Sequence, residues 1–357
     1  MSLVLVDDFL SVVLENRALL DVRAPIEFEG GAFPTSTNIA ILDDEQRRLV
    51  GTCYKQDGNA AAVKLGQKLV DKQQRVLAWK AYIKENPDAY LYCFRGGQRS
   101  RISQAWLDEA GVVIPRLKGG YKAFRRFLAE QSLEISANTK TVIIGGRTGS
   151  GKTILLQKLS NAIDLEAIAK HRGSSFGKFI SPQPSQIDFE NALYYKLIKH
   201  NAGQHKQLII EHESHNIGRV YIPKPIFDNF NKGSLVILHT PLAERIEITH
   251  EEYITNAIKE YEAIFKEDGK LLWYENIVAG LDRIQKRLGS ERHLNIKSIL
   301  TQSYTNDNNE GHKEWIKILL SEYYDPMYDY QLAKSSLPVL FEGNAKEIID
   351  FLHNTTI

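Results

Sequence analysis

The sequence is poor in the features that would place it outside the ordinary globular classes. It has only two cysteines among 357 residues, Cys53 and Cys93, which is too few for a disulfide framework. No apolar run reaches the roughly 18 residues of a membrane span, and the start, MSLVLVDDFL, has no basic leader or small-residue cleavage site. We therefore expect a cytoplasmic protein with free thiols and no membrane partner.

An excess of charge of one sign is also missing. The formal net charge is +1, and 43% of the residues are hydrophobic and 25% charged, which is typical of a soluble globular protein. Near-neutrality neither requires nor excludes a nucleic-acid partner, because a surface field depends on where the charges lie. The length allows two or three domains, each with its own core.

Two α/β patterns follow one another along the chain. The first starts at the apolar run ALLDV, and after SLEISANTK (residues 132–140) the pattern restarts at TVIIGG and becomes mostly helical from about residue 248. Strands alternating with helices predict mostly parallel sheets covered on both faces. We therefore expect an α/β protein with two domains, residues 1–135 and residues 136–357, the second with a helical C-terminal extension.

The segment YCFRGGQRS places a thiol in a turn that favours anions. Cys93 ends an apolar run, and two glycines and two arginines lead from it into a predicted helix. Glycines let backbone N–H groups converge, and a helix N-terminus adds positive potential, so both favour a thiolate or a bound anion. Arg95 and Arg99 supply guanidinium donors. Cys93, Arg95 and Arg99 are the candidate catalytic residues, whereas Cys53 lacks such surroundings and is interpreted as a packing residue.

Two chemistries use a cysteine in this setting. The Cys-x5-Arg-Ser spacing from Cys93 to Ser100 is that of cysteine phosphatases, in which a thiolate attacks phosphorus. In the rhodanese class of sulfurtransferases the cysteine carries a persulfide. The segments LLDVRAPIEFEGG and RLKGGYKAF resemble the opening and the end of a rhodanese domain, and this resemblance favours the second class. The loop size still suits a tetrahedral phosphorus better than a bare sulfur atom.

The segment GRTGSGKT matches the phosphate-binding pattern G-x-x-x-x-G-K-[ST] in full, between the apolar strand TVII and the helical ILLQKLSNAI. Loop amides would surround a diphosphate, with Lys152 neutralising its charge and the Thr153 hydroxyl on a magnesium ion. Glu211 and Glu213 end the next apolar strand, where a carboxylate would bind the metal through water; solvated charges are the alternative. Thr153 and Glu211 are the candidate metal ligands. The candidate phosphate-binding residues here are Gly146, Gly149, Ser150, Gly151, Lys152 and Thr153.

A third segment, HRGSSFG (residues 171–177), places histidine, arginine and serine donors between glycines and has no periodicity, which indicates a loop. We predict that Arg172 and Ser174 contact a substrate phosphate. The alternative is a surface loop whose glycines serve turns.

Together these segments resemble the tRNA 2-selenouridine synthase family. Nine segments occur in the order that the family shows. They are DVRAPIEFEGGAFP, VGTCYKQ, YCFRGGQRS, RLKGGYKAFR, the phosphate-binding loop GRTGSGKT (the P-loop), DLEAIAKHRGSSFG, QPSQIDFENAL, EHESHNIG and ERIE. FPTSTNIA (residues 33–40) departs from the family's Pro-Gly-Ala-like turn, which concerns only the local loop shape. The part from about Asn256 onward matches least distinctly.

The resemblance implies replacement of sulfur by selenium at C2 of a wobble 2-thiouridine in tRNA. Geranyl diphosphate first alkylates the sulfur, and selenophosphate then delivers selenium while geranyl thiol leaves. We expect the P-loop to bind the diphosphate and the Cys93 loop to take selenophosphate, with Arg95 and Arg99 on its phosphate oxygens. A slot for the geranyl chain is expected beside the P-loop, in SSFGKFI or FENALYY.

For the tRNA partner, local basic clusters matter more than net charge. The candidates, for which a solvated helix face is the alternative, are Arg125, Arg126, Arg283, Lys286, Arg287 and Arg292. Two other functions stay open: a cysteine phosphatase fused to a P-loop small-molecule kinase, and a binding protein switched by a nucleotide at the P-loop.

Overall fold

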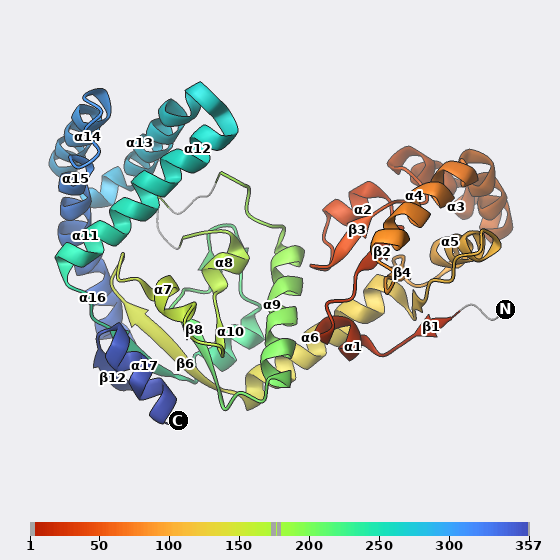
Figure 1. Ribbon diagram of the computed structural model, residues 1–357, viewed down its shortest axis with the longest axis horizontal. Helices are drawn as coiled ribbons and strands as arrows, with labels where there is room; N and C mark the ends of the chain where they lie inside the picture. Colours follow the sequence, from red (N-terminus) through yellow and green to blue (C-terminus); the bar gives the residue numbers. More distant parts are fainter. Residues whose placement is uncertain (1–3, 173–175, 177–179, 356–357) are drawn as a thin grey trace. The chain divides into compact units, whose positions relative to one another are not determined.

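The computed structural model describes residues 4–172, 176 and 180–355 (Figure 1). The chain folds into two compact units. The first consists of Met1–Ala137 and Pro184–Gln204, and the second of Asn138–Gln183 and His205–Ile357. Each unit has a parallel five-stranded sheet with helices around it, which confirms the predicted α/β class with two domains.

The sheet of the first unit has the strand order β1-β5-β4-β2-β3, and all its paired strands are parallel. Its three inner strands β5, β4 and β2 are short and almost wholly buried, because helices cover both faces and leave little room for polar side chains. The strands are β1 (Leu5–Val6), β2 (Leu19–Asp21), β3 (Ser36–Asn38), β4 (Tyr90–Tyr92) and β5 (Arg116–Leu117). The helices that precede the second unit are α1 (Phe9–Leu14), α2 (Pro25–Glu29), α3 (Asp44–Leu69), α4 (Lys72–Glu85), α5 (Gln98–Glu109) and α6 (Gly120–Asn138).

The segment expected to separate the two domains, residues 132–140, is helical as far as Asn138. Ser132, Ile135 and Ser136 are buried on one side of α6, at the spacing of a helix face that packs against a core. The break between the two units falls between Ala137 and Asn138, inside the expected segment.

Helix α9 (Gln186–Ala202) belongs to the first unit although the preceding and following segments belong to the second. Its side chains satisfy backbone groups near Ala32: Asp188 Oδ1 accepts from the Ala32 N–H at 2.8 Å, and Asn191 Nδ2 donates to the Ala32 carbonyl at 2.7 Å. Tyr195 packs edge-on against Phe124 of α6. The expected domains, residues 1–135 and 136–357, are each continuous in sequence. The first compact unit also includes the later helix α9, because long-range packing holds α9 against it.

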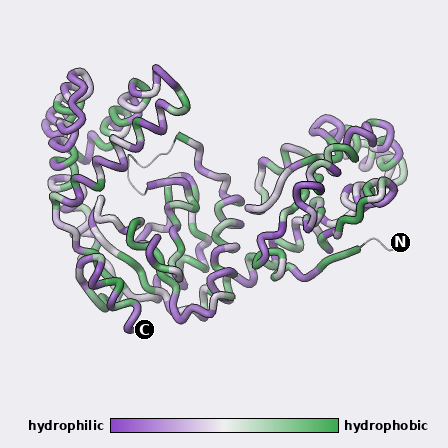
Figure 2. The backbone as a smooth tube through the Cα atoms, in the orientation of Figure 1, coloured by the Kyte–Doolittle hydropathy of each residue, from purple (hydrophilic) through white to green (hydrophobic). Residues whose placement is uncertain are grey.

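The sheet of the second unit has the order β12-β11-β6-β8-β7, again with parallel pairs, so β6 lies in the middle between β11 and β8. Figure 2 shows apolar stretches along these strands, as expected where both faces are covered. The strands are β6 (Lys140–Gly146), β7 (Ala162–Ile163), β8 (Gln207–Glu211), β11 (Ser234–Leu238) and β12 (Val339–Gly343). Around them lie the helices α7 (Lys152–Leu156), α8 (Leu165–Ala169) and α10 (Lys224–Phe230), and the hairpin of β9 (Asn216–Ile217) and β10 (Val220–Tyr221).

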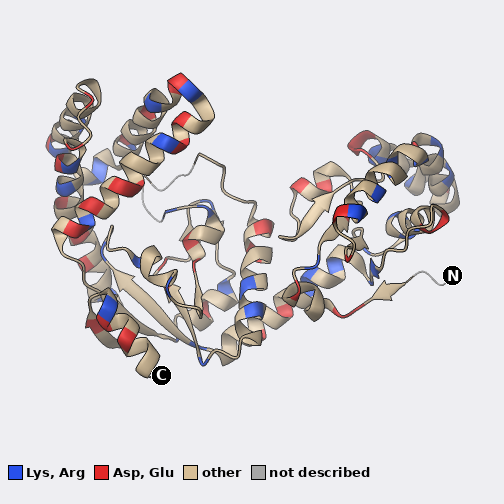
Figure 3. Cartoon of the chain, viewed as in Figure 1, with Lys and Arg blue, Asp and Glu red and all other residues tan. Residues whose placement is uncertain are grey.

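The chain beyond residue 241 is mostly helical, as predicted, and packs around a core that includes Trp273 and Trp315. Its helices contain both basic and acidic residues (Figure 3). Strand β12 was not expected and adds a fifth strand beside β11. No helix in the described part of the chain combines the length and the apolar character that a bilayer crossing needs. The helical elements are α11 (Leu242–His250), the π-helix η1 (Glu251–Asn256), α12 (Ala257–Phe265), the 3-10 helix η2 (Lys266–Asp268), α13 (Gly269–Leu288), α14 (Ser290–Thr305), α15 (His312–Leu319), the π-helix η3 (Leu320–Tyr324), α16 (Asp325–Lys334) and α17 (Ala345–Asn354).

Candidate functional site

The first candidate site is the loop between β4 and α5, which carries Cys93. The Cys93 side chain is 3% exposed, and its Sγ donates to Ser100 Oγ at 3.1 Å. Ser100 Oγ in turn donates to the Gly97 carbonyl oxygen at 3.2 Å. The thiol therefore lies at the start of α5, next to the positive end of that helix, as the sequence predicted.

A second glycine-rich turn supports this loop from behind. Gly96 and Gly120 both have positive φ, +64° and +60°, and a Cβ at Gly120 would overlap the carbonyl oxygen of Cys93. The Tyr121 N–H donates to that carbonyl at 2.9 Å. The glycine pair of RLKGGYKAF thus lets the N-terminus of α6 hold the backbone of the cysteine loop.

The backbone N–H groups of the loop are available to a ligand. In the described ranges, none of the N–H groups from Arg95 to Ser100 donates to another protein atom. Arg116 of β5, which sequence reasoning missed, donates from Nη1 to the Gly96 carbonyl and from Nε to Gln104 Oε1 at 3.1 Å. Burial lowers the pKa of Arg116, and the nearby Cys93 opposes this shift. A lone arginine inside the run VVIPRL was the signal that could have found it.

The two predicted arginines differ in their surroundings. The Arg95 side chain is exposed and, among described residues, has no carboxylate partner. Arg99 donates with both terminal nitrogens to Glu27, from Nη2 at 3.1 Å, and Arg47 lies 3.2 Å from the same carboxylate. Burial of Glu27 would raise its pKa, but the hydrogen bond and charge of Arg99 outweigh burial and hold this pKa below its usual value. Arg95 is therefore the more accessible cation for an anionic ligand.

The Asp-Val-Arg motif builds the scaffold of this loop. Arg23 Nε donates to Asp21 Oδ2 at 2.8 Å, and the two side chains are 2% and 0% exposed. The Arg23 guanidinium also lies over the Tyr121 ring, 4.0 Å from its centroid. A charge pair this deeply buried and fully hydrogen-bonded fixes the end of β2 and the start of α6.

A cleft of about 770 Å³ opens beside Cys93. Its walls come from α3, α5 and the cysteine loop, and both apolar and cationic side chains line it. Cys93, Phe94, Arg95 and Arg99 lie on one side, so the thiol faces this cleft although little of its own surface is exposed.

The second candidate site is the P-loop between β6 and α7. Gly149 and Gly151 have φ of +75° and +81°, which a residue with a side chain would adopt only with strain. Lys152 Nζ donates to the Gly146 carbonyl at 3.0 Å, so its ammonium group lies across the mouth of the loop. Thr240, just after β11, donates to the Ser150 carbonyl at 2.8 Å.

The helical C-terminal part holds the P-loop from outside. Arg245 of α11 is 2% exposed, donates from Nε to the Thr148 carbonyl at 2.9 Å and from Nη1 to Asp325 at 3.0 Å. Arg147 donates from Nη2 to Asp329 of α16 at 2.8 Å. The ERIE segment and α16 therefore act on the loop through its carbonyl groups and its flanking arginine.

The cavity at the P-loop, about 950 Å³, carries acidic side chains. Lys152 and Thr153 line it together with Glu166 and Glu213. Burial and the hydrogen bond with Glu213 raise the pKa of Glu166 to about 9, and burial raises that of Glu213 as well. Raised pKa values favour the protonated carboxyl form, so this pair carries less negative charge near Lys152 than two ordinary carboxylates would.

The predicted metal ligand Glu211 lies behind the cavity wall. It is 3% exposed, and its Oε1 accepts from the Glu166 N–H at 2.6 Å, while Oε2 is buried without a partner. Burial raises its pKa to about 8. Glu213, two residues later, lines the cavity together with Thr153. In the described ranges no group of three or more His, Cys, Asp or Glu side chains could hold a metal ion.

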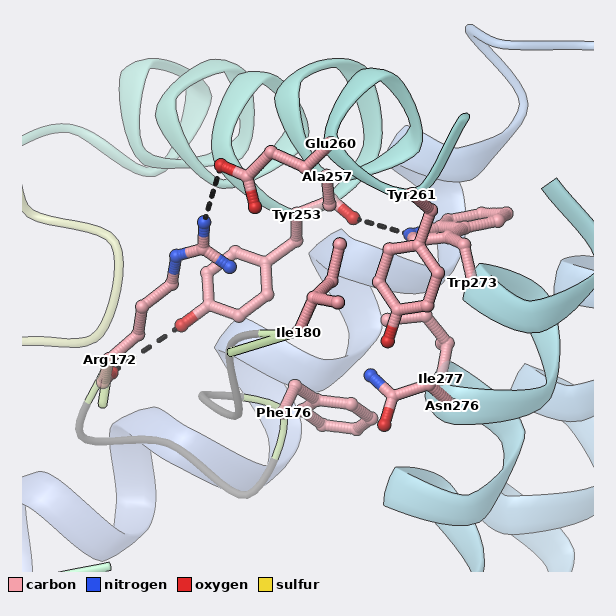
Figure 4. Close-up of a pocket in the computed structure, with 10 residues that line it drawn as sticks. All are labelled: Arg172, Phe176, Ile180, Tyr253, Ala257, Glu260, Tyr261, Trp273, Asn276 and Ile277. Carbon is pink, nitrogen blue, oxygen red and sulfur yellow. Dashed lines mark hydrogen bonds and ion pairs between the residues drawn. The ribbon is translucent and has the colours of Figure 1, made fainter. Parts of the chain in front are cut away.

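The third predicted segment is described only in part, and Ser174 lies outside the described residues. Arg172 lines the P-loop cavity, and its Nη2 lies 3.6 Å from Glu260 of α12. Figure 4 shows Arg172 beside Tyr253, with Phe176 pointing toward Ile277 of α13. The predicted phosphate contact thus lies at the cavity, although its charge is shared with a carboxylate.

Comparison with known proteins identifies the domain that carries each loop. Residues 8–127 match the model of the rhodanese-like domain, and residues 139–357 match that of the tRNA 2-selenouridine synthase AAA domain. Curated proteins named tRNA 2-selenouridine synthase are 51% identical in Sulfurovum sp. and 48% identical in Hydrogenovibrio crunogenus. Each alignment covers 97% of this chain, with 97% of the first relative and 98% of the second. The chain belongs to the tRNA 2-selenouridine synthase family.

The two segments expected to form a slot for the geranyl chain lie in different surroundings. FENALYY lies in α9, within the first unit, and its Phe189, Tyr194 and Tyr195 are buried there. Within SSFGKFI, Phe176 lines a small apolar space of about 30 Å³ that also touches Thr148 of the P-loop.

Of the residues predicted to contact tRNA, Arg125 is half-buried and the others are exposed. Arg125 donates to Asn191 at 2.8 Å and pairs with Glu190, so it fastens α9 to α6. Arg126 is exposed, 3.9 Å from Glu130, and Arg292 donates to Glu322 at 2.8 Å. The exposed basic residues of α13 are Arg283, Lys286 and Arg287.

Proposed function

We propose that this chain converts wobble 2-thiouridine of tRNA into 2-selenouridine through an S-geranyl intermediate, with geranyl diphosphate and selenophosphate as co-substrates. The observation that carries the proposal is the presence of two glycine-containing loops, each at the start of a helix, with opposite electrostatic surroundings. The Cys93 loop is flanked by arginines, and the P-loop faces carboxyl groups. Two different phosphorus-bearing substrates call for two such sites.

The first step belongs to the P-loop. The C2 sulfur of 2-thiouridine attacks C1 of the geranyl chain, the C1–O bond breaks, and diphosphate leaves with the bonding electrons, while the N3 proton passes to solvent. Lys152 and the loop N–H groups stabilise the departing diphosphate. The Thr153 hydroxyl and Glu213, both at the cavity, fit a magnesium ion that keeps several waters. Such an ion would supply positive charge beside the leaving group.

The second step belongs to the Cys93 loop. Selenophosphate lies against the free N–H groups and Arg95, with Arg99 next to it. Its selenium adds to C2, and the C2–S bond breaks, so that geranyl thiolate leaves and takes the proton of the Cys93 thiol, which solvent then restores. Water then cleaves the P–Se bond, which gives phosphate and the C2 selenocarbonyl with a proton on N3. No external oxidant or reductant is needed.

Mass spectrometry of nucleosides tests this function directly. Purified protein is incubated with 2-thiouridine-containing tRNA, and geranyl diphosphate and selenophosphate are supplied singly or together. We expect S-geranyl-2-thiouridine with geranyl diphosphate alone and 2-selenouridine only with both. Release of phosphate from an aryl phosphate without any tRNA product would favour a phosphatase, and tight nucleotide binding without any product would favour a switch protein.

A further inference from the structure

We propose that the cleft beside Cys93 holds the geranyl group of the S-geranyl intermediate during the selenium step. The inference rests on the proposed function and adds to it a second binding site for the isoprenoid chain, on the first unit. The first sign is size. A volume of about 770 Å³ falls within the roughly 300–1,000 Å³ typical of pockets for drug-sized ligands. Selenophosphate alone has one selenium, one phosphorus and three oxygens, and cannot fill this space.

The lining of the cleft is the second sign. Beyond the cysteine loop, apolar side chains of α3 and α5 form one continuous part of the lining, beside polar and cationic ones. A phosphate site has no use for such a wall, whereas a ten-carbon chain gains from leaving water. The apolar residues of this wall include Val50, Ala62, Val63, Val70, Ile102 and Trp106.

The shape of α3 creates this wall. Gly58 has φ +82° and ψ −175°, so the helix is interrupted there and its two parts face each other. A Cβ at Gly66 would lie 3.6 Å from Val50 Cγ2, which shows how closely the two parts approach. The VGTCYKQ segment, for which the sequence suggested no role, belongs to this folded-back helix.

The charges around the cleft fit an occupant attached to RNA. Arg47, Lys55 and Arg95 line it together with the apolar wall. In the described part of the chain, Lys55 and Arg95 pair with no carboxylate, so both are available for phosphates of the anticodon loop. The occupant should therefore have three properties: an apolar group for the wall, a nucleotide whose phosphates meet the cations, and a reacting carbon that reaches the cysteine loop. The S-geranyl nucleoside of tRNA has all three.

Val63 offers a clean test, because it is half-buried on the wall and lies outside the cysteine loop. Val63→Trp fills the cleft, and Val63→Thr keeps the shape but adds a hydroxyl group. Lys64→Trp is the matched control, since Lys64 is exposed on the same helix and does not line the cleft. Thermal unfolding checks that each variant is folded.

The substrates are anticodon stem-loops with S-geranyl- or S-methyl-2-thiouridine at the wobble position. Binding is measured by fluorescence anisotropy, and conversion with selenophosphate by mass spectrometry. We expect wild type and Lys64→Trp to bind the S-geranyl form at least about tenfold more tightly than the S-methyl form, and Val63→Trp to lose this preference. Val63→Thr should reduce the preference about threefold, consistent with a smaller loss of apolar contact.

An unchanged geranyl preference in folded Val63→Trp overturns the proposed cleft, and so does an equal loss of affinity for both stem-loops. Failure of the broader function looks different. In that case wild type converts neither stem-loop with selenophosphate, and the binding preference then decides separately whether the cleft recognises the geranyl group.

Discussion

The Cys93 loop and the P-loop are built alike but placed in opposite electrostatic surroundings. Each follows a buried strand, turns on at least one glycine with positive φ, and leads into a helix. Arg95, Arg99 and Arg116 surround the first, whereas carboxyl groups such as Glu166 and Glu213 line the cavity of the second. Similar backbone geometry therefore does not imply similar ligands. Under the proposed function, the neighbouring charges decide whether an anion binds alone or with a cation.

The largest expected effect comes from Cys93→Ser. We expect 2-selenouridine formation to fall to background while S-geranyl-tRNA accumulates, because a serine hydroxyl is a much weaker acid than a thiol and cannot supply the proton that the leaving geranyl thiolate takes in the second step. Nucleoside mass spectrometry measures both products. Cys53→Ser is the control, since Cys53 lies in α3, outside the cysteine loop, and does not line the cleft, and it should behave as wild type. Loss of both products in Cys93→Ser would contradict a division of labour between the loops.

The converse change is Lys152→Ala in the P-loop. We expect geranylation to fall roughly 100-fold or more, because one cation beside the leaving diphosphate is lost. Selenium transfer to tRNA that already carries the S-geranyl group should continue. Lys158→Ala serves as the control, since Lys158 is exposed and does not line the cavity. Equal damage to both steps would mean that the two loops form one site.

The next largest effect should come from removing magnesium, which should stop the reaction at the P-loop but not the reaction at the Cys93 loop. Chelation, with spermidine present to keep the tRNA folded, should stop geranylation, because diphosphate would otherwise enter a cavity lined by Glu166, Glu213 and Glu252. Selenium transfer from selenophosphate should persist at the arginine-rich loop. We expect Glu213→Gln to raise the magnesium concentration needed for half-maximal geranylation about tenfold. Geranylation at full rate without divalent ions would contradict this difference.

Glycine substitutions test how rigidly the cysteine loop is held. Gly120→Ala should lower the free energy of unfolding by about 2 kcal/mol or more, since the new Cβ would overlap the Cys93 carbonyl at a positive φ. Gly97→Ala should cost well under that amount, because Gly97 has φ −89° and open space around its Cα. Chemical denaturation of the two variants gives the comparison. Equal stability losses would show that the contact with α6 is not what holds the loop.

Both loops could be predicted from the sequence because their signals are local. A strand, glycines and a helix within about ten residues define each one, and the structure places Cys93 and Lys152 where that pattern requires. Arg116 and helix α9 escaped prediction because their contacts join residues far apart in the sequence. The metal ligand Glu211 stays a prediction. Glu213 lines the cavity and Glu211 does not, and no local pattern marks the end of β8, which decides which carboxyl group reaches the cavity.

The smallest effect should come from the Glu27 carboxylate, which neutralises part of the positive field at the cysteine loop. Glu27→Gln leaves Arg99 without its ion partner, so selenophosphate should bind about two- to threefold more tightly at low salt, and the gain should vanish at high salt. Because Arg99 holds the pKa of Glu27 below its usual value, the ion pair stabilises the wild-type fold above about pH 4.5 and this contribution is lost as pH falls further.

The gain in affinity should accordingly be the same at pH 6 and pH 8, where Glu27 is ionised in the wild type. Glu29→Gln is the matched control, because Glu29 is exposed on the same helix. Competition by inorganic phosphate in the selenium step measures the affinity. A tighter site in Glu29→Gln, or none in Glu27→Gln, would mean that backbone N–H groups rather than arginine charge set anion binding at this loop, and the electrostatic contrast with the P-loop would then rest on the carboxyl groups of the second unit alone.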